Sequence, residues 1–335
     1  MTIKVVVVED SSTVRDALIG VLRRSGEFDV AASTPSGVEA VELCARHRPD
    51  VVTMDMVLND MSGLEATRAI MQSCPVPIVI VSSSTNRRDL FRTYDALADG
   101  ALDVYEKPPG SITPAWEVGL LRVLRVCARV AVVTRRPRVR QPVRPRPTVR
   151  PQVVAMGAST GGPVALSIIL GLLPKEYRPA ILVVNHISPA FGTGLPEWLG
   201  TQTELDVSFA RDGAELPTHG VWLAPPGTHL VVDAGKTHLR DGPELHSCRP
   251  SVDVLFHSLT HIGSRAVGVL LTGMGRDGAA GLRAMRDAGA VTFVQDAASS
   301  VVWGMPRRAL EQRAVDRAHS LHEIAECLLG LGGAR

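Results

Sequence analysis

The sequence predicts an α/β protein made of two domains, each built on a mainly parallel sheet. The first observation is the length, because 335 residues exceed what one domain usually holds. The second is the composition: hydrophobic residues make up 45% of the chain and aromatic residues only 4%, which favours cores of small aliphatic side chains, as in parallel sheets. The third is a pattern in which short, valine-rich apolar runs alternate with helical segments.

A proline- and arginine-rich segment interrupts this alternation. Its cations, with no acidic residue among them, are Arg135, Arg136, Arg138, Arg140, Arg144, Arg146 and Arg150, and its prolines are Pro137, Pro142, Pro145, Pro147 and Pro151. Proline has no amide hydrogen to donate and like charges repel, so the segment should be extended. We predict one domain over residues 1–130, a linker over 131–152 and a second domain over 153–335.

An arm that binds nucleic acid is the alternative interpretation of this segment, because arginine-rich tracts attract phosphate. No interleaved aromatic residues or helix-turn-helix pattern accompany the arginines. The formal charge of the whole chain is +2, so without these seven cations the remainder carries −5. The balance outside the linker is therefore slightly acidic, which disfavours nucleic acid as a partner.

Several protein classes are disfavoured by the rest of the composition. No apolar run approaches the roughly 18 residues that a membrane span needs, and the first residues do not resemble a signal peptide. The cysteines are scattered, odd in number and never spaced as CxxC: Cys44, Cys74, Cys127, Cys248 and Cys327. Neither a disulfide framework nor a zinc knuckle is indicated. We expect a soluble, cytoplasmic protein.

The first domain is predicted to be an open, parallel, doubly wound sheet. Its first strand is the apolar run Ile3–Val8, and the next helix is capped by Ser11 or Ser12 and stops at Gly26. Val14, Leu18, Val21 and Leu22 form the apolar stripe of this helix. Further strands are predicted near Val30, over Val51–Met54, over Ile78–Val81 and near Val104–Tyr105, with a helix over Ser36–His47. Ligands of such sheets bind beyond the carboxyl ends of the strands.

Polar residues stand at those carboxyl ends. Glu9 and Asp10 end the first strand, Asp55 the third and Ser82 the fourth, and Lys107 follows the fifth. Three carboxylates brought together would repel one another unless a cation lay among them, and all-oxygen ligands suit Mg²⁺. Asp55 could attack a phosphoryl donor while Ser82 and Lys107 contact the new phosphoryl oxygens. The alternative is that each strand merely ends in an ordinary polar residue.

With this pattern, residues 3 to about 125 resemble the receiver domain of two-component systems. The resemblance implies that Asp55 is the phosphoacceptor and that Glu9, Asp10 and the backbone carbonyl of Val57 bind Mg²⁺. Receivers commonly carry Met-Pro shortly after the aspartate, where this chain has Leu58-Asn59. The position of the usual aromatic switch residue is occupied by Val104, with Tyr105 one place later.

The second domain begins with a strand, a glycine turn and a helix: Val153–Met156, Gly157–Gly162 and Pro163–Leu170. The turn contains Gly-x-Ser-x-Gly and suits two chemistries. Its amides could cradle a phosphate, or it could present Ser159 as a nucleophile. It lacks the G-x-G-x-x-G spacing of dinucleotide-binding folds and the Gly-Lys-Ser/Thr of a P-loop.

A serine nucleophile needs a base, and the strand Ile181–Asn185 leads into His186. Other histidines are less well placed. His257 and His261 stand at i,i+4 in an apparent helix and could bind a metal, but no HExxH glutamate accompanies them, which favours packing or solvent exposure. His229, after Ala224–Gly227, is expected in a turn, where it could line the site or be an ordinary loop histidine. Asp277 lies in a glycine-rich loop after the strand Val267–Leu271, either as the carboxylate that orients the base or as the N-cap of a helix before Ala279.

These loops resemble the catalytic domain of the chemotaxis protein-glutamate methylesterases, the CheB family. The motifs that carry the resemblance are Gly157–Gly162, Asn185–Pro189, Arg249–Asp253, Thr272–Gly275 and Trp303–Pro306. It implies a Rossmann-like, mainly parallel sheet, with Ser159 as nucleophile, His186 as general base and Asp277 as its orienter. Met274 is the implied oxyanion donor, Thr160 helps hold His186, and Asn185 replaces the glutamine that commonly precedes the histidine.

The two resemblances together imply a serine esterase that demethylates glutamates of chemoreceptors and deamidates their glutamines. Its receiver would inhibit the catalytic domain until a chemotaxis histidine kinase phosphorylates Asp55, with Mg²⁺ serving the receiver and no cofactor serving the esterase. The expected partners are methylated chemoreceptors and the kinase, without nucleic acid or membrane insertion. Two rival functions are a response regulator with a nucleic-acid-binding output and a nucleotide-binding domain that uses residues 157–162.

Overall fold

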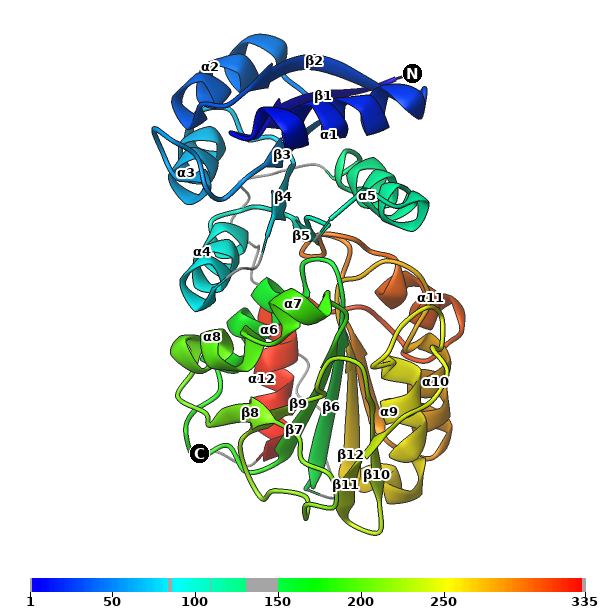
Figure 1. The fold of residues 1–335 in the computed structure, drawn as a ribbon. Helices are drawn as coiled ribbons and strands as arrows, with labels where there is room; N and C mark the ends of the chain where they lie inside the picture. Colours follow the sequence, from blue (N-terminus) through cyan, green and yellow to red (C-terminus); the bar gives the residue numbers. More distant parts are fainter. Residues whose placement is uncertain (1, 84–85, 109, 131–149, 333–335) are drawn as a thin grey trace. The chain divides into compact units, whose positions relative to one another are not determined.

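The computed structural model describes residues 2–83, 86–108, 110–130 and 150–332. It divides into two compact units, Met1–Pro137 and Arg138–Arg335 (Figure 1). The predicted linker over residues 131–152 lies almost wholly outside the described residues. Within the described ranges, no helix combines the length and the apolar character that crossing a membrane requires.

The first unit contains the predicted five-stranded parallel sheet. Its strands are β1 (Ile3–Val8), β2 (Phe28–Thr34), β3 (Val51–Met54), β4 (Ile78–Ser82) and β5 (Asp103–Glu106). Their order is β2-β1-β3-β4-β5, and all neighbours are parallel. The chain therefore winds outward in both directions from β1, which brings the carboxyl ends of β1 and β3 together at the switch point of the sheet.

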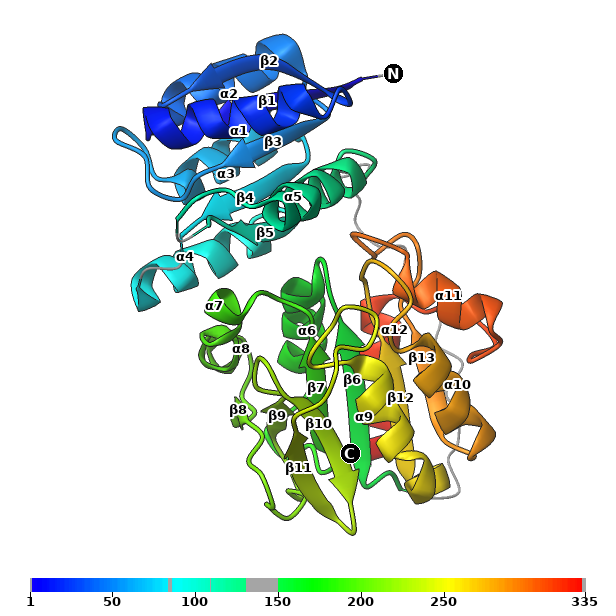
Figure 2. The same ribbon diagram turned by 45° about the vertical axis from the view of Figure 1, so that its right-hand side comes forward.

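Five helices connect these strands: α1 (Ser12–Arg24), α2 (Gly37–His47), α3 (Gly63–Ser73), α4 (Arg87–Ala98) and α5 (Pro114–Cys127). Ser11 caps α1 and Ser36 caps α2, each by accepting a hydrogen bond from a backbone amide of the first turn. The stripe of α1 is buried at Leu18, Val21 and Leu22. Figure 2 shows α1 and α5 on one face of the sheet and α2 and α3 on the other, which confirms a doubly wound domain.

The second unit is built on six parallel strands: β6 (Val153–Ala158), β7 (Ala180–Asn185), β8 (Val207–Phe209), β9 (Val221–Leu223), β12 (Ala266–Leu270) and β13 (Val291–Val294). Their order is β13-β12-β6-β7-β9-β8, and every neighbouring pair is parallel. A separate antiparallel hairpin joins β10 (His229–Asp233) to β11 (Lys236–Arg240). The predicted parallel sheet is thus confirmed in this unit as well.

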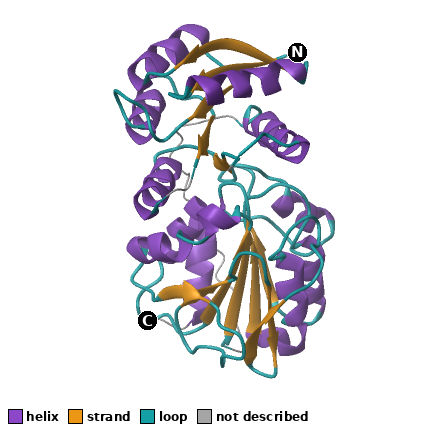
Figure 3. Cartoon of the chain, viewed as in Figure 1, coloured by secondary structure: helices purple, strands orange, loops and turns teal. Residues whose placement is uncertain are grey.

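The helices of this unit are α6 (Gly162–Gly171), α7 (Pro189–Gly192), α8 (Leu195–Gln202), α9 (Val252–Ser258), the 3₁₀ helix η1 (Thr260–Arg265), α10 (Ala279–Asp287), α11 (Met305–Glu311) and α12 (Leu321–Gly332). Figure 3 shows them on both sides of the strands, with α6 and α12 on one side and α9 and α10 on the other. The winding reverses at β6, between β7 and β12. The loops after these three strands are therefore expected to line the crevice at the switch point.

Two expectations about histidines were wrong. His257 lies in α9, which ends at Ser258, whereas His261 lies in η1, so the two share no helix and no i,i+4 face. His229 begins β10 rather than lying in a turn, and it is buried. Its Nδ1 accepts a hydrogen bond from the Ser251 amide (3.2 Å), and its Nε2 donates to the Pro243 carbonyl (3.0 Å). With both nitrogens occupied, the His229 ring has a structural role.

Candidate active site

Ser159 and His186 follow neighbouring strands in register. Ala158, the last residue of β6, pairs with Asn185, the last residue of β7, and the His186 amide donates to the Ala158 carbonyl at 2.9 Å. The residues that follow these two strands, Ser159 and His186, therefore lie about one strand spacing, roughly 5 Å, apart. Gly161, with φ of +76°, then turns the chain into α6 in a conformation that other residues rarely adopt.

The loop after β12 closes against the serine. The Ser159 amide donates to the Thr272 carbonyl at 3.0 Å. A Cβ atom built on Gly273 would lie 2.7 Å from the Cβ of Ser159, a separation that real side chains do not reach. Glycine is therefore required at position 273 for the loop to approach the serine, which accounts for one glycine of the Thr272–Gly275 motif.

A histidine–carboxylate pair stands beside the serine. The Nε2 atom of His186 lies 2.8 Å from Oδ2 of Asp277. The same carboxylate accepts hydrogen bonds from the Val252 amide (2.7 Å), the Ser251 hydroxyl (2.7 Å) and the Asp253 amide (3.1 Å). Both oxygens of Asp277 are thus held by two donors each, so its orientation toward the imidazole is fixed.

Asp277 is not the N-cap of the helix that follows it in the sequence. The cap position of α10 is Gly278, which forms no side-chain cap. Asp277 instead accepts from backbone amides at the start of α9, more than 20 residues earlier in the chain. The helix-cap alternative for α10 was therefore wrong, and the Arg249–Asp253 motif is explained as the donor set for this carboxylate.

The electrostatics of the pair favour a charged contact. Burial alone would lower the pKa of His186, but the hydrogen bond that its ring donates to Asp277 and the nearby Cys248 raise this pKa to about 9. Burial would raise the pKa of Asp277, but the bonds from His186 and Ser251 lower it overall. In the free protein the imidazole is thus mostly protonated at neutral pH, and Asp277 is ionised.

The contact between nucleophile and base is open. Among the hydrogen bonds of residues 150–332, none joins Ser159 to the His186 ring. Because Nε2 faces Asp277, Nδ1 is the nitrogen left to meet the serine hydroxyl. Catalytic hydrogen bonds are often long before substrate binds, so a small side-chain rotation is enough to complete the arrangement.

The loop at Met274 presents a free donor. Across the described part of the second unit, the Met274 amide has no protein acceptor, whereas the Gly273 amide donates to the Val302 carbonyl at 2.9 Å. The Gly273 carbonyl in turn accepts from the amides of Gly304 (3.2 Å) and Met305 (2.9 Å). The Trp303–Pro306 motif thus holds this loop in place and leaves one amide to bind an anionic oxygen.

Two buried side chains support the same loop. Oε1 of Gln295 accepts from the Thr272 amide at 2.7 Å, and the Thr272 hydroxyl donates to the Thr160 carbonyl at 2.9 Å. Thr160 is therefore tied to the loop through its backbone, while its predicted action on His186 stays a prediction. Sequence reasoning missed Gln295, because a single glutamine after β13 carries no pattern of its own.

The predicted phosphorylation residues come together in the first unit. Nζ of Lys107 lies 2.8 Å from Oε2 of Glu9 and 2.8 Å from Oδ2 of Asp55. Carboxylate oxygens of Glu9, Asp10 and Asp55 lie within 4.8 Å of one another. Ser82 ends β4 and is buried. Three carboxylates facing one lysine form an oxygen-rich, negatively charged pocket, which fits Mg²⁺.

Burial and mutual repulsion shape this pocket. Desolvation and then the charge of Asp55 raise the pKa of Glu9 to about 7, against the opposing effect of Lys107. Burial likewise raises the pKa of Asp55. A divalent cation would relieve both effects, because it favours the ionised carboxylates. The carbonyl of Val57 stays a predicted ligand.

The residue next to the usual switch position has a defined environment. The Tyr105 hydroxyl donates to the Trp116 carbonyl at 2.9 Å, and the two rings meet edge to face with centroids 5.4 Å apart. Gly119 leaves room for this hydroxyl, since a Cβ there would lie 2.1 Å from it. Tyr105 is therefore anchored to α5, and Val104 precedes it on β5.

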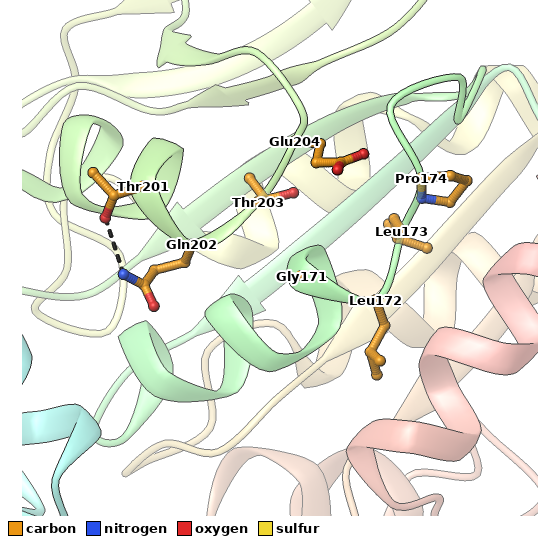
Figure 4. Close-up of a pocket in the computed structure, with 8 residues that line it drawn as sticks. All are labelled: Gly171, Leu172, Leu173, Pro174, Thr201, Gln202, Thr203 and Glu204. Atoms are coloured by element: carbon orange, nitrogen blue, oxygen red, sulfur yellow. Dashed lines mark hydrogen bonds between the residues drawn. The ribbon is translucent and has the colours of Figure 1, made fainter.

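A surface pocket of the second unit lies away from these residues. Figure 4 shows it between the carboxyl-terminal ends of α6 and α8, lined by residues 171–174 and 201–204. Ser159 lies before the amino end of α6, a helix of ten residues and about 15 Å. This pocket is therefore separate from the catalytic loops.

Comparisons with known proteins agree with this geometry. The family model for CheB methylesterase matches residues 154–328, and that for the response regulator receiver domain matches residues 5–111. The protein-glutamate methylesterase/protein-glutamine glutaminase of Nitrosospira multiformis is 41% identical, covering 99% of this chain and 98% of the relative. A relative with the same description from Anaeromyxobacter dehalogenans is 42% identical, covering 97% and 96%.

A solved structure matches the second unit. The CheB methylesterase catalytic domain of Thermotoga maritima is 34% identical, with a TM-score of 0.52, and covers 55% of this chain and 100% of that domain. The family models account for both units, and the relatives align over nearly the full chain. The chain therefore belongs to the CheB methylesterase family and combines its catalytic domain with a response regulator receiver domain.

Proposed function

We propose that this protein is a phosphorylation-activated serine esterase that hydrolyses methyl esters of glutamate side chains in chemoreceptors and deamidates receptor glutamines. The observation that carries the proposal is the pairing of Ala158 with Asn185, which sets Ser159 and His186 at the ends of neighbouring strands, with His186 bonded to Asp277 at 2.8 Å. The names of relatives about 40% identical over the whole chain support the same substrate class. Neither rival output, nucleic-acid binding or nucleotide binding, has comparable support.

In the proposed first step, Ser159 attacks the ester carbonyl. A serine hydroxyl is a poor nucleophile, so Nδ1 of neutral His186 takes its proton as the bond to carbon forms. Asp277 keeps the other ring proton on Nε2 and stabilises the imidazolium that results. The oxygen of the carbonyl becomes an anion, which the free Met274 amide is placed to bind. Losing one such donor typically costs about 100- to 1000-fold in rate.

In the second step, the tetrahedral intermediate collapses. The imidazolium of His186 returns its proton to the leaving oxygen, so methanol departs and an acyl-Ser159 remains. Water then attacks the acyl group and His186 takes a proton from it. The imidazolium returns that proton to the Ser159 oxygen as the acyl–serine bond breaks, and the product ionises to a glutamate carboxylate. A glutamine side chain follows the same route with ammonia as the leaving group.

In the receiver, Asp55 is the proposed phosphoacceptor: its carboxylate oxygen attacks the phosphorus atom of the donor, the bond from phosphorus to the donor breaks, and the donor departs. Glu9, Asp10, Asp55 and the Val57 carbonyl would hold Mg²⁺, which neutralises phosphoryl charge when it is bound. Lys107 already reaches Asp55 at 2.8 Å, so it and Ser82 are placed to contact the added oxygens. We expect the unphosphorylated receiver to inhibit the esterase and phosphorylation to release it.

The proposed partners are methylated chemoreceptors as substrate and a chemotaxis histidine kinase as phosphodonor, which places the protein in the cytoplasm. The decisive experiment incubates the full chain with methyl-labelled receptor membranes from its own cell and measures methanol release, with and without a small-molecule phosphodonor. Release that increases with the phosphodonor supports the proposal. Absence of methanol release with well-methylated receptors would overturn it.

Asp277→Asn is expected to lower kcat about 10⁴-fold, because no carboxylate then keeps the ring proton of His186 on Nε2. This loss is smaller than the one expected when the serine is removed. An amide cannot accept all four hydrogen bonds that Asp277 accepts, so at least one buried donor is left unpaired, at a cost of about 1–3 kcal/mol in unfolding free energy. Methanol release is assayed well below the thermal midpoint of the variant. If Asp277→Asn released methanol at the wild-type rate, Asp277 would have no catalytic role and would serve only to cap α9.

The pH profile gives a second readout of the same contact. The base must be neutral, so wild-type kcat/KM should increase with pH up to about 9, where the pKa of His186 lies. The carboxylate of Asp277 raises that pKa, so its removal in Asp277→Asn should move the midpoint toward lower pH. Coincident midpoints for the two proteins would contradict the assignment of His186 as the base.

Removal of the receiver is expected to activate the esterase. A fragment over residues 151–335 should hydrolyse receptor methyl esters about 5- to 150-fold faster than the unphosphorylated full chain, if the inhibition has the usual allosteric coupling of about 1–3 kcal/mol. Phosphodonor should accelerate only the full chain. A fragment no faster than the full chain would show that phosphorylation acts by improving catalysis or receptor docking.

A further inference from the structure

A third side chain joins the histidine–carboxylate pair. Cys248 contributes a sulfur atom to a cluster in which a ring nitrogen of His186, Sγ of Cys248 and a carboxylate oxygen of Asp277 all lie within 4.8 Å of one another. The three residues come from three separate segments: the end of β7, the loop before α9 and the loop after β12. The proposed esterase reaction uses the imidazole and the carboxylate but has no role for the thiol.

The backbone holds this thiol in place. Leu245 and Cys248 exchange both backbone hydrogen bonds (3.1 and 3.0 Å), which closes a tight turn whose two central residues, His246 and Ser247, have φ of 55° and 60°. Oδ2 of the buried Asp253 lies 3.1 Å from Nε2 of His246 and fastens the turn to α9. The position of Cys248 is therefore built into the fold rather than left to a free loop.

The thiol is also available. As a donor, Sγ makes one weak hydrogen bond, to the His246 carbonyl at 3.5 Å, and as an acceptor it interacts with the neighbouring His186 ring, which belongs to the same cluster. Cys248 is half-buried, and the His186 side chain is 13% exposed, so the cluster can be reached from solvent. A thiol, an imidazole and a carboxylate together are the donor set that proteins use for zinc.

We propose that a thiophilic divalent metal ion, with Zn²⁺ as the biological example, binds His186, Cys248 and Asp277 and switches the esterase off. Tetrahedral coordination at ordinary bond lengths places such ligand atoms about 3.3–3.6 Å apart. The 2.8 Å contact between Nε2 of His186 and Oδ2 of Asp277 therefore has to open by about 0.5 Å, while Sγ of Cys248 starts within 4.8 Å of a ring nitrogen and a carboxylate oxygen. Rotation of the His186 and Cys248 side chains supplies this adjustment, and Asp277 keeps its hydrogen bonds to Ser251, Val252 and Asp253. Three protein ligands leave the fourth position to water.

The inhibition follows from the proton balance of the imidazole. A neutral ring has one N–H and one lone pair, and in the working enzyme Nε2–H faces Asp277 while the lone pair of Nδ1 serves Ser159. A metal ion on Nε2 uses the electron pair of that nitrogen, so the one proton that the ring keeps resides on Nδ1, and the second proton of a protonated ring passes to solvent. The Cys248 thiol loses its proton to solvent. His186 then cannot accept the serine proton, and the first step stops.

Two other clusters serve as internal comparisons. His246, Asp253 and Asp277 also lie within 4.8 Å of one another but offer no sulfur. The receiver cluster of Glu9, Asp10 and Asp55 offers only oxygen, which suits Mg²⁺ better than zinc. Thiolate ligation therefore distinguishes the proposed site from both.

The first test measures metal binding and does not depend on esterase activity. Co²⁺ is added to the full chain in excess Mg²⁺, and absorbance is followed for a thiolate-to-cobalt charge-transfer band. We expect the band in wild type and in Ser159→Ala, and its loss in Cys248→Ser. Cys74→Ser, which removes a half-buried thiol of the receiver, is the matched control and should keep the band. Absence of the band in wild type, or its persistence in Cys248→Ser, would overturn the proposal.

The second test measures inhibition and rests on the proposed esterase function. Methanol release by the full chain is titrated with Zn²⁺, each variant being normalised to its own metal-free rate, and then restored with EDTA. Cys248→Ser should need at least tenfold more Zn²⁺ for half inhibition, whereas Cys74→Ser should match wild type. Equal sensitivity of Cys248→Ser and wild type would refute the inhibitory site. If no variant hydrolyses ester at all, the esterase proposal fails while the cobalt result still decides the metal site.

Discussion

Ser159→Ala is expected to reduce methyl ester hydrolysis by about 10⁶-fold, to the residual rate that substrate binding and the oxyanion donor still support. The substitution removes the attacking oxygen, so no acyl intermediate can form. His186→Ala should be nearly as damaging, because a serine without its base is a poor nucleophile and members of a triad act as a unit. Methanol release from labelled receptors measures both.

The control for this experiment lies on the adjoining helix. Ser167 in α6 is half-buried, and its hydroxyl donates to the Val164 carbonyl of its own helix at 2.9 Å, with no other side-chain hydrogen bond among residues 150–332. Ser167→Ala therefore makes the same chemical change away from the catalytic loops. It should retain near-wild-type activity. Ser159→Ala should still accept phosphate at Asp55. Substantial methanol release by Ser159→Ala would refute the serine mechanism.

Buried strands were the part of the fold that could be predicted most closely. The predicted limits of Ile3–Val8 and Val51–Met54 match β1 and β3, because a strand buried over most of its length is a nearly continuous apolar run with a polar residue after its end. Such an end also marks the edge of the sheet where parallel strands meet. That is why Glu9, Asp10 and Asp55 could be placed in one pocket from the sequence.

Short or half-exposed strands escaped prediction. β8 and β9 have three residues each, and β10 and β11 mix polar with apolar residues. None of them therefore shows an apolar run, or an alternation of apolar and polar residues, that is long enough to predict a strand. His229 was misplaced for this reason: the Pro-Pro-Gly before it indicates a turn, but the histidine already pairs with Arg240 in the hairpin. Pairing between distant strands is a tertiary feature that local pattern does not carry.

The catalytic site divides in the same way. Ser159 and His186 could be placed because each directly follows a buried strand, and strand order then brings them into register. The anchoring of Asp277 by the start of α9 could not be deduced, since the donors lie about 25 residues away with no spacing rule. Cys248 was missed for a related reason: a tertiary turn brings it to the histidine.

Asp55→Asn is expected to abolish phosphorylation of the receiver and, with it, activation of the esterase by phosphodonor. The amide keeps the shape of the side chain but is no longer an effective nucleophile toward phosphorus. The fold should persist for two reasons. Loss of the Asp55 charge relieves the repulsion that helps to raise the pKa of Glu9, and Lys107 keeps its contact with Glu9 at 2.8 Å. Acid-labile radiolabel from a phosphodonor, in the presence and absence of Mg²⁺, measures the effect.

The matched control stands at the other end of the same strand. Asp50 precedes β3, is exposed, and accepts a hydrogen bond from the Lys4 amide at 2.7 Å, so Asp50→Asn makes the same change away from the pocket. Asp50→Asn should be phosphorylated like wild type when Mg²⁺ is present. It should gain no label when EDTA removes Mg²⁺ before the donor is added. Because Asp55 is the proposed single acceptor, label that persists at the wild-type level in Asp55→Asn would mean that another residue receives the phosphoryl group, and the regulatory proposal would have to be rebuilt around it.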